Sequence, residues 1–330
     1  MKKLLAGDVG ATKTNLGIYS TEKGPRQPLA MATFSSSRYP SLAALVSEFL
    51  AQVKLGVEHA VFGVAGPVVN GRVAGVNMPW SIDQVDIKAQ LKLKSVLLLN
   101  DVEATAHGVP LLDSADLHCL NKGEQVQGGT MAVIAPGTGL GQAFLTWDGS
   151  RYRAHASEGG HTDFAPASPL EDGLLQYLRN QEKQVSYESV CSGIGLPHIY
   201  RFLKDSGHAE EPLWLAEQLE QTDDPTALIV TAALEDRARL CTETLKVFVS
   251  ILGAAAGNLA LTVMATGGVY LGGGIPPRIL PALRDDTFMA AFCRKGVLTE
   301  FMRRIPVYVI LDPQIALLGA AFQGLELFSG

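Results

Sequence analysis

The stretch Leu4-Leu5-Ala6-Gly7-Asp8-Val9-Gly10-Ala11-Thr12, followed by the apolar run at residues 16–19, indicates how the chain folds. It predicts two short strands, at residues 4–6 and 16–19, joined by a glycine-rich turn over residues 7–12. A similar pattern returns later, with strands at 132–134 and 143–146 around a turn at 136–141. Two copies of one strand–turn–strand unit favour a duplicated domain.

Apolar strands alternate with helices along the rest of the chain. A helix is predicted over residues 41–54, because Leu42, Leu45, Val46 and Phe49 recur at helical spacing. Further strands are expected at residues 60–64, 95–99, 152–156, 269–271 and 307–311. Further helices are expected at residues 170–179, 213–221, 226–252 (running on towards 261) and 314–328. This alternation predicts an α/β fold with largely parallel sheets.

Length, composition and charge exclude several classes of protein. A chain of 330 residues fits two domains of ordinary size. Hydrophobic residues make up 47% and charged residues 18%, which excludes a disordered chain. Lys and Arg number 27 against 33 Asp and Glu, so the net charge of −6 lacks the basic field of a general nucleic-acid binder.

The cysteines and the most apolar stretch indicate in which cellular compartment the protein is expected. The four cysteines form no CxxC pair, which favours free thiols in a reducing cytoplasm: Cys119, Cys191, Cys241 and Cys293. Residues 247–277 carry no charge and are long enough to cross a membrane. Their seven glycines and Asn258 instead favour a buried helix, a buried strand and a glycine turn. We therefore expect a soluble protein with no membrane or nucleic-acid partner.

Three glycine turns each follow an apolar strand. Besides the first, they are Gly137-Thr138-Gly139-Leu140-Gly141 and Gly272-Gly273-Gly274. Glycine allows backbone N–H groups to approach an anion, and the hydroxyls of Thr12, Thr14 and Thr138 add donors. Any one such turn is also what a tight hairpin requires. Three of them in one chain favour a phosphate clamp.

Asp8 stands inside the first of these turns. A carboxylate beside a phosphate is repelled by it unless a cation lies between them, and Mg²⁺ prefers such oxygen ligands together with retained waters. Asp8 is thus a candidate for Mg²⁺ binding through water. A local Asx turn is the structural alternative.

The sequence Asn100-Asp101-Val102-Glu103 stands at the carboxyl end of a predicted strand, where open α/β sheets bind ligands. Asp101 could accept a proton from an attacking hydroxyl while Asn100 orients the substrate. Asn100 and Glu103 also have the spacing of a helix capping box. The spacing alone does not separate these two interpretations.

A second polar group, Glu158-Gly159-Gly160-His161, follows the strand at 152–156 on a loop that the glycines are expected to loosen. Its carboxylate and imidazole suit binding of vicinal hydroxyls. A plain turn is one alternative, and a metal site with His155 and Asp163 is another.

Glu188 could be an ordinary helix-start glutamate. Asn77 and Trp80 could each belong to the site or serve only in packing.

Together these segments resemble bacterial glucokinases, within the superfamily of hexokinase, actin and heat-shock chaperone ATPases. The first two glycine turns resemble the family's phosphate motifs, and Gly272–Gly274 its adenosine motif. Residues 99–101 resemble its sugar and catalytic motif, 158–161 its glucose-binding loop, and 186–193 the segment that supplies a further sugar-binding glutamate. The resemblance covers essentially the whole chain.

The resemblance implies two ribonuclease-H-like lobes around a cleft, with residues 1–110 plus 312–330 forming the smaller lobe and 111–311 the larger. It implies a cytoplasmic, ATP- and Mg²⁺-dependent kinase that converts glucose to glucose 6-phosphate in the first step of glycolysis. Asp101 would be the general base, and glucose would be bound by Asn100, Asp101, Glu158, His161 and Glu188. Bound ATP would contact Gly7, Asp8, Val9, Gly10, Ala11, Thr12, Gly137, Thr138, Gly139, Gly272, Gly273 and Gly274. The resemblance also favours a homodimer.

Two departures from the family pattern stand out. Ala11 replaces the second glycine of the usual turn and would cost about 1 kcal/mol or more if that position needed a positive φ. Glu103 stands where the family commonly has an aromatic or aliphatic residue. The alternatives to a glucokinase are a kinase for another hexose or an acylated amino sugar, and a non-catalytic sugar sensor on the same fold.

Overall fold

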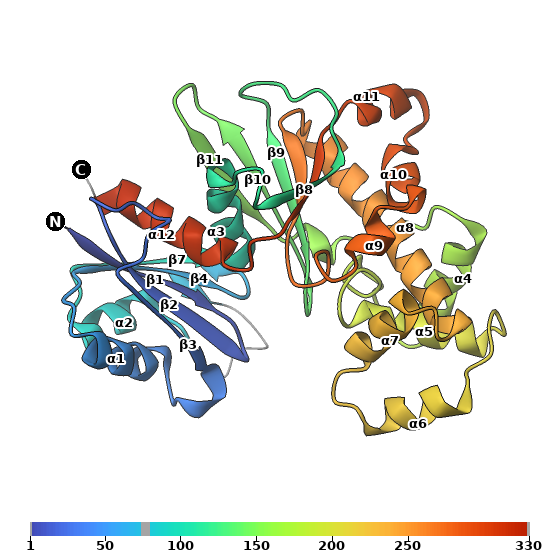
Figure 1. Cartoon of the computed structure of the whole chain (residues 1–330), viewed down its shortest axis with the longest axis horizontal. Coiled ribbons are helices and arrows are strands. Elements are labelled where there is room, and N and C mark those ends of the chain that lie inside the picture. Colours follow the sequence, from blue (N-terminus) through green and yellow to red (C-terminus); the bar gives the residue numbers. More distant parts are fainter. Residues whose placement is uncertain (1, 74–79, 329–330) are drawn as a thin grey trace. The chain divides into compact units, whose positions relative to one another are not determined.

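A computed structural model describes residues 2–73 and 80–328 of the chain, whose helices and strands are labelled in Figure 1. The chain divides into two compact units. Unit 1 consists of Met1–Asp113, Ala143–Ala156 and Asp312–Gly330, and unit 2 of Ser114–Gln142 and Ser157–Leu311. The lobe boundaries expected from the sequence stay a prediction. The structure groups Ala143–Ala156 with unit 1, whereas the sequence division assigns it to the larger lobe.

Unit 1 is built on a five-stranded sheet with the order β3-β2-β1-β4-β7. Strand β1 is antiparallel to β2 and parallel to β4, which in turn is parallel to β7. The sheet strands are β1 (Lys3–Val9), β2 (Lys13–Ser20), β3 (Ala30–Ser35), β4 (His59–Val64) and β7 (Ser95–Asn100). A short antiparallel pair is formed by β5 (Val68–Val69) and β6 (Arg72–Val73).

Alternating side chains of β1 cover the two faces of this sheet. Leu5 packs with α1 (Leu42–Val53) and α2 (Gln84–Leu91) in one core. Leu4 and Ala6 pack in another, with α3 (Asp101–Gly108) and α12 (Ile315–Phe328). Figure 1 shows these helix pairs on opposite faces of the sheet. Short 3-10 turns η1 (Ser36–Arg38) and η2 (Val109–Leu111) complete the helical elements up to Asp113.

The second sheet repeats the order of the first. Its strands run β11-β10-β9-β12-β13-β8, so the first five match β3-β2-β1-β4-β7 position by position. Strand β12 is parallel to both β9 and β13, and β8 is added antiparallel at the edge. This repetition confirms the predicted duplication. The strands are β8 (Leu117–Asn121), β9 (Met131–Pro136), β10 (Leu140–Trp147), β11 (Tyr152–Ser157), β12 (Gly268–Leu271) and β13 (Val307–Ile310).

Helices make up much of unit 2 and share one large core with its strands. They are η3 (Gly159–His161), α4 (Pro169–Arg179), α5 (Gly195–Asp205), α6 (Leu213–Gln221), α7 (Pro225–Leu234), α8 (Arg239–Val263), α9 (Leu280–Leu283), α10 (Asp286–Cys293), η4 (Gly296–Leu298) and α11 (Thr299–Arg303). The four cysteines are free, as expected, and all but Cys119 are buried.

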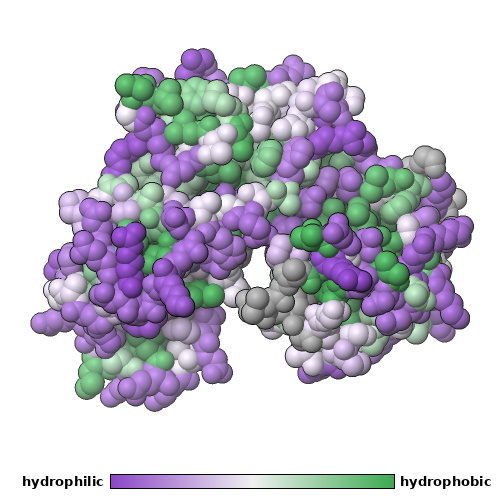
Figure 2. Space-filling model, turned by 180° about the vertical axis from the view of Figure 1, so that it is seen from behind, coloured by the Kyte–Doolittle hydropathy of each residue, from purple (hydrophilic) through white to green (hydrophobic). Residues whose placement is uncertain are grey.

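The uncharged stretch forms the second half of α8 and strand β12, as the sequence predicts. Helix α8 is the one described helix long and apolar enough to span a membrane, and 67% of its most apolar window is buried inside the protein. Such burial is typical of a core helix. On the face shown in Figure 2, hydrophilic residues predominate and separate the patches of apolar residues.

The long helix predicted from residue 226 onwards is wrong in one respect. It is two helices, α7 and α8, separated at residues 235–238. Asp236 has a φ of 51°, in the left-handed region, which an α-helix cannot continue through. Helices α2, α5, α9, α10 and α11 were not predicted. The predicted helix at residues 314–328 is confirmed as α12.

Close packing of α12 against α3 depends on Gly319. A Cβ atom there would overlap the backbone carbonyl oxygen of Ala104, which cannot move without distorting α3. We predict that Gly319→Ala lowers the free energy of unfolding by about 1–3 kcal/mol, as overpacking usually does. Urea denaturation followed by circular dichroism measures this effect.

The matched control is Gly56→Ala, because a Cβ at Gly56 meets no atom within 4 Å. Equal stability of the two variants would contradict the proposed packing constraint.

Candidate active site

The first glycine turn is shorter than the sequence predicts. Strand β1 runs through Val9, so Gly7 and Asp8 belong to the strand and the tip of the hairpin is residues 10–12. The reason is packing: a Cβ on Gly7 would lie 2.5 Å from the Phe62 ring, so this glycine permits close contact inside the sheet. The N–H of Gly10 donates to the Lys13 carbonyl (3.0 Å), which closes the tip.

Ala11 does not strain this tip. It is not among the described residues with positive φ, so the cost anticipated for replacing a glycine does not arise. The tip is held from outside by Ser36, whose hydroxyl donates to the Gly10 carbonyl at 2.7 Å. The backbone N–H of Ser36 donates to the Thr12 carbonyl at 2.9 Å. The hairpin tip is therefore fixed by the residue that follows β3.

The carboxylate of Asp8 is half-buried on the same hairpin. Asn15 faces it across the strands and donates from Nδ2 to Asp8 Oδ2 at 3.0 Å. Burial raises the pKa of Asp8, and the Asn15 hydrogen bond and the charge of Lys13 oppose this shift. Sequence reasoning missed Asn15, because the predicted turn was too long to place residues 8 and 15 in register.

A hard-oxygen ligand of this kind fits Mg²⁺, which is commonly held by one or two protein carboxylates together with phosphate oxygens and water. Over residues 2–73 and 80–328, no group of three or more His, Cys, Asp or Glu side chains is arranged to hold a metal ion. Asp8 therefore fits an ion that one protein carboxylate shares with a phosphate. It does not fit an ion held entirely by protein ligands.

Asn100 and Asp101 stand where β7 becomes α3. Asn100 is the N-cap: its Oδ1 accepts from the N–H groups of Val102 (2.9 Å) and Glu103 (3.2 Å). Glu103 Oε2 accepts from the Asn100 N–H at 3.3 Å, which completes the capping box. The structural interpretation of this motif is thus confirmed. The box leaves Asp101 as the first residue of the helix, partly exposed and with Oδ1 2.9 Å from the Val102 N–H.

Strand register brings this motif close to the hairpin tip. Val9, Val64 and Asn100 occupy equivalent positions on β1, β4 and β7. Gly63 lies between the two sites, since a Cβ on it would be 3.8 Å from both the Gly7 carbonyl oxygen and Asp101 Cα. Unit 1 therefore places Asp8 and Asp101 at the carboxyl ends of β1 and β7, two parallel strands on either side of β4, where such sheets bind ligands.

Unit 2 joins the other two glycine turns. The Gly272 N–H donates to the Ile134 carbonyl (2.9 Å) and the Ile275 N–H to the Pro136 carbonyl (3.2 Å). Gly273 has a φ of +79°, and a Cβ there would lie 2.5 Å from the Pro136 oxygen. The turns after β12 and β9 thus lie side by side. A Cβ at Gly137 or Gly274 would meet no atom within 4 Å, so there is space beside both residues. The Gly137 N–H itself donates to the Gly139 carbonyl at 2.9 Å.

The predicted sugar-binding residues of unit 2 gather at the second turn. His161 Nδ1 lies 3.9 Å from Glu188 Oε1, and His161 Nε2 lies 3.9 Å from Glu158 Oε2. Glu188 Oε2 accepts from the Leu140 N–H at 2.8 Å. The side chains of Glu158 and His161 are 52% and 60% exposed, so they can reach a ligand. Glu188 is not at a helix start, because α5 begins only at Gly195.

The glycines of this loop are tightly packed, contrary to the expectation that they loosen it. A Cβ on Gly160 would overlap the Leu140 carbonyl oxygen, and the segment is the short helix η3. Sequence reasoning also missed Asn258, which donates to the Tyr187 hydroxyl at 2.7 Å and so supports the residue before Glu188. No pattern in the sequence signals that contact.

Of the two residues with open roles, Trp80 belongs to the core of unit 1. Its side chain is 9% exposed, and Nε1 donates to the Tyr39 carbonyl at 2.8 Å. Asn77 lies outside the described residues.

Comparisons with known proteins show the family of the chain. The sequence model of the family described as Glucokinase matches residues 5–326. A glucokinase from Nostoc punctiforme is 39% identical over 335 residues, covering 97% of this chain and 98% of the relative. A glucokinase from Colwellia psychrerythraea is 35% identical, covering 96% and 94% of the two chains.

Solved structures show the same fold. The crystal structure of a glucokinase from an Antarctic psychrotroph superposes with a TM-score of 0.84 at 29% identity, covering 99% of both chains. A ROK family glucokinase from Streptomyces griseus, solved with glucose and AMPPNP, gives a TM-score of 0.66 at 20% identity, covering 98% of this chain and 99% of the other. With the family model matched from residue 5 to residue 326, this chain belongs to the glucokinase family.

Proposed function

We propose that this protein transfers the γ-phosphoryl group of ATP to the 6-hydroxyl of D-glucose, giving glucose 6-phosphate and ADP. The observation that carries the proposal is the position of Glu188. Its carboxylate contacts both the phosphate-type turn, at the Leu140 N–H, and His161 of the sugar-binding group. Ligands suited to a polyol and backbone suited to a phosphate thus meet in one unit.

The sugar is bound by acceptors and donors that match vicinal hydroxyls. We assign glucose binding to Glu158, His161 and Glu188 of unit 2 and to Asn100 and Asp101 of unit 1. Carboxylates accept hydrogen bonds from hydroxyls, and an imidazole can donate or accept. Glu188 is held by the Leu140 N–H and Asn100 by its capping contacts, so these two are positioned before the ligand binds.

Asp101 is assigned as the general base that accepts the proton of the 6-hydroxyl. As the first residue of α3, it stands at a helix N-terminus, which stabilises a carboxylate. Phosphoryl transfer depends mainly on positioning and charge neutralisation, so a carboxylate of ordinary basicity is sufficient.

ATP is assigned to the glycine turns, with phosphates at the hairpin tip of unit 1 and at Gly137–Gly139, and adenosine at Gly272–Gly274. Asp8 would hold Mg²⁺ through water, and the ion would supply charge neutralisation between the phosphates. The space beside Gly137 and Gly274, where a Cβ would meet no atom within 4 Å, supports these assignments. We expect the enzyme to be cytoplasmic and homodimeric.

A kinase for another hexose or an acylated amino sugar would use the same residues. A panel of sugars, each assayed with Mg-ATP for ADP release, separates these substrates from glucose.

Replacement of the proposed base tests the catalytic assignment and distinguishes an enzyme from a non-catalytic sugar sensor. We expect Asp101→Asn to lower kcat by about 10²–10⁴, the usual contribution of general-base catalysis, and to leave glucose affinity within a few-fold. A coupled assay of glucose 6-phosphate formation and a glucose titration measure the two quantities. Asp172→Asn, in the exposed first turn of α4, is the control. Near wild-type turnover of Asp101→Asn would refute the role.

Removal of one sugar ligand tests the binding group. Glu158→Gln loses a charged acceptor, so we expect the KM for glucose to rise by roughly tenfold or more while the KM for ATP stays the same. Initial rates with each substrate varied in turn provide both constants. Glu217→Gln, an exposed carboxylate on α6, is the control. A rise in the ATP constant alone would contradict the assignment.

The ionised carboxylate of Asp8 should lower the stability of the fold while it supports turnover. Because burial raises its pKa in the folded state above the unfolded value of 3.8, folded Asp8 binds a proton more tightly, and its ionisation destabilises the fold as pH rises. Asp8→Asn keeps an acceptor for Asn15 and removes the charge. We expect a higher Tm than wild type at pH 7, a difference that shrinks towards pH 4, and turnover reduced by about tenfold or more.

Thermal melts from pH 4 to pH 8 and the coupled assay test this expectation. Asp223→Asn, in the exposed segment between α6 and α7, should change neither quantity. A Tm difference that grows on acidification would contradict the sign.

A further inference from the structure

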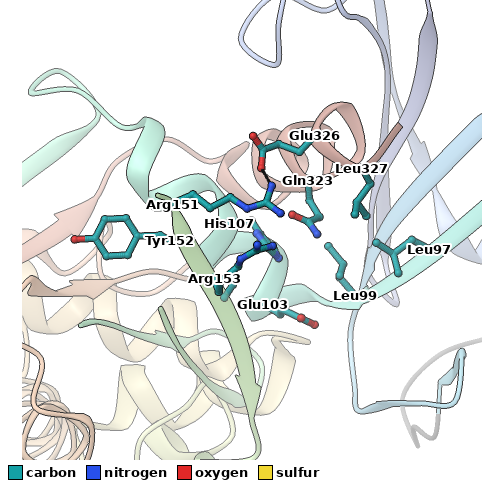
Figure 3. A pocket seen from close by; sticks show the side chains of 11 residues that line it. Leu97, Leu99, Glu103, His107, Arg151, Tyr152, Arg153, Gln323, Glu326 and Leu327 are labelled. Atoms are coloured by element: carbon teal, nitrogen blue, oxygen red, sulfur yellow. Dashed lines mark hydrogen bonds and ion pairs between the residues drawn. The ribbon is translucent and has the colours of Figure 1, made fainter. Parts of the chain in front are cut away.

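Unit 1 contains a pocket of about 340 Å³ that none of the assigned substrate contacts uses. It is an open pocket lined by β7, α3, α12 and β11 with the residue before it, and Figure 3 shows its side chains. Its lining residues are Leu97, Leu99, Glu103, His107, Arg151, Tyr152, Arg153, Ala154, Gln323, Glu326 and Leu327.

Two arginines make one side of the pocket cationic. Arg151 directly precedes β11 and Arg153 lies within it, and Figure 3 shows both guanidinium groups beside His107. Arg153 Nε donates to Asp148 Oδ2 at 2.6 Å, and Arg151 Nη1 pairs with Glu326. Burial, followed by the charges of these arginines, lowers the pKa of His107 to about 4, so its imidazole is neutral at pH 7.

Several polar groups of the lining have no protein partner within residues 2–73 and 80–328. They are the Arg153 Nη atoms, the Gln323 amide and Glu103 Oε1, since the only contacts found are Arg153 Nε to Asp148 and Glu103 Oε2 to Asn100. No buried side-chain nitrogen or oxygen in the described residues lacks a hydrogen bond. The unpartnered atoms are therefore accessible to solvent, and their residues line the pocket.

We propose that this pocket binds a small phosphorylated polyol. Arginine guanidinium groups are the preferred partners of phosphate oxygens, since they donate in a fixed fork. Glu103, Gln323 and the neutral His107 offer acceptors and donors to hydroxyls, which explains carboxylates in a pocket that also binds an anion. Leu97, Leu99 and Leu327 form an apolar wall, seen on one side in Figure 3. The volume lies at the lower end for small-ligand pockets, and a monosaccharide phosphate is of suitable size.

The proposal deepens the proposed function and rests on it in one respect: the ligand belongs to the chemical class of the product. Glu103 gives the pocket a direct connection to the catalytic motif. The same carboxylate lines the pocket and accepts from the Asn100 N–H, next to Asp101. A hydroxyl that binds Glu103 therefore acts on the capping box at the start of α3.

Isothermal titration of the full-length protein with glucose 6-phosphate tests the proposal, with saturating glucose present to occupy the substrate site. We expect binding to the wild type, and a Kd at least about tenfold weaker in the double variant R151Q/R153Q, because two charged hydrogen bonds are lost. R151K/R153K keeps the charge without the fork, so its Kd should be intermediate. Arg303→Gln removes an exposed ion pair with Glu300 and should bind like wild type.

The outcomes separate this site from the substrate site. Absence of binding under saturating glucose, or equal affinity of wild type and R151Q/R153Q, overturns the proposal. Circular dichroism melts show whether the variants fold, and the lysine variant decides the case if the glutamine variant does not. Since the titration needs no turnover, failure of the proposed kinase activity would leave a positive result for the pocket intact.

Discussion

Parallel pairing of the central strands determines where the glycine turns, Asp8 and Asp101 lie. In unit 1, the hydrogen bonds of β1 with β4 and of β4 with β7 set Val9, Val64 and Asn100 in one row, so the chain leaves the sheet at the same edge each time. In unit 2, β9 and β12 are paired in the same way and their glycine turns follow at one edge. Without this register Asp8 and Asp101 would be distant side chains with no shared chemistry.

The duplicated hairpins and most of the other strands could be read from the sequence, because alternating or continuous apolar residues are a local signal. Strands β3, β5, β6 and β8 were not predicted. Long amphipathic helices such as α1 were also readable, although the role of Ser41 as its N-cap became visible only in the structure. The break between α7 and α8 was not, because it depends on the left-handed conformation of Asp236, which the surrounding apolar pattern does not reveal. Helix α5 was missed although its residues are largely buried.

The glycines were identified correctly as special, but mostly for a different reason. Of the site glycines Gly7, Gly10, Gly137, Gly139 and Gly272–Gly274, only Gly273 has a positive φ in the described structure. Gly7 is required by the Phe62 ring, and Gly160 by the Leu140 carbonyl. Sequence indicates that a glycine is needed, but whether for a turn or for close packing depends on which distant segment lies against it. That information is tertiary, so it could not be predicted from local spacing.

Asn100 and Glu103 show why structural and catalytic interpretations of one motif need not compete. A capping box fixes the first residue of a helix, because both the N-cap side chain and the third residue are committed to backbone N–H groups. Asp101 is that first residue, so the contacts that stabilise α3 also fix the position of its carboxylate at the end of β7. A general base needs a fixed position more than an unusual pKa when the reaction is phosphoryl transfer. The capping interaction therefore supplies what the proposed chemistry requires, and evidence for the cap is evidence for a well-positioned base.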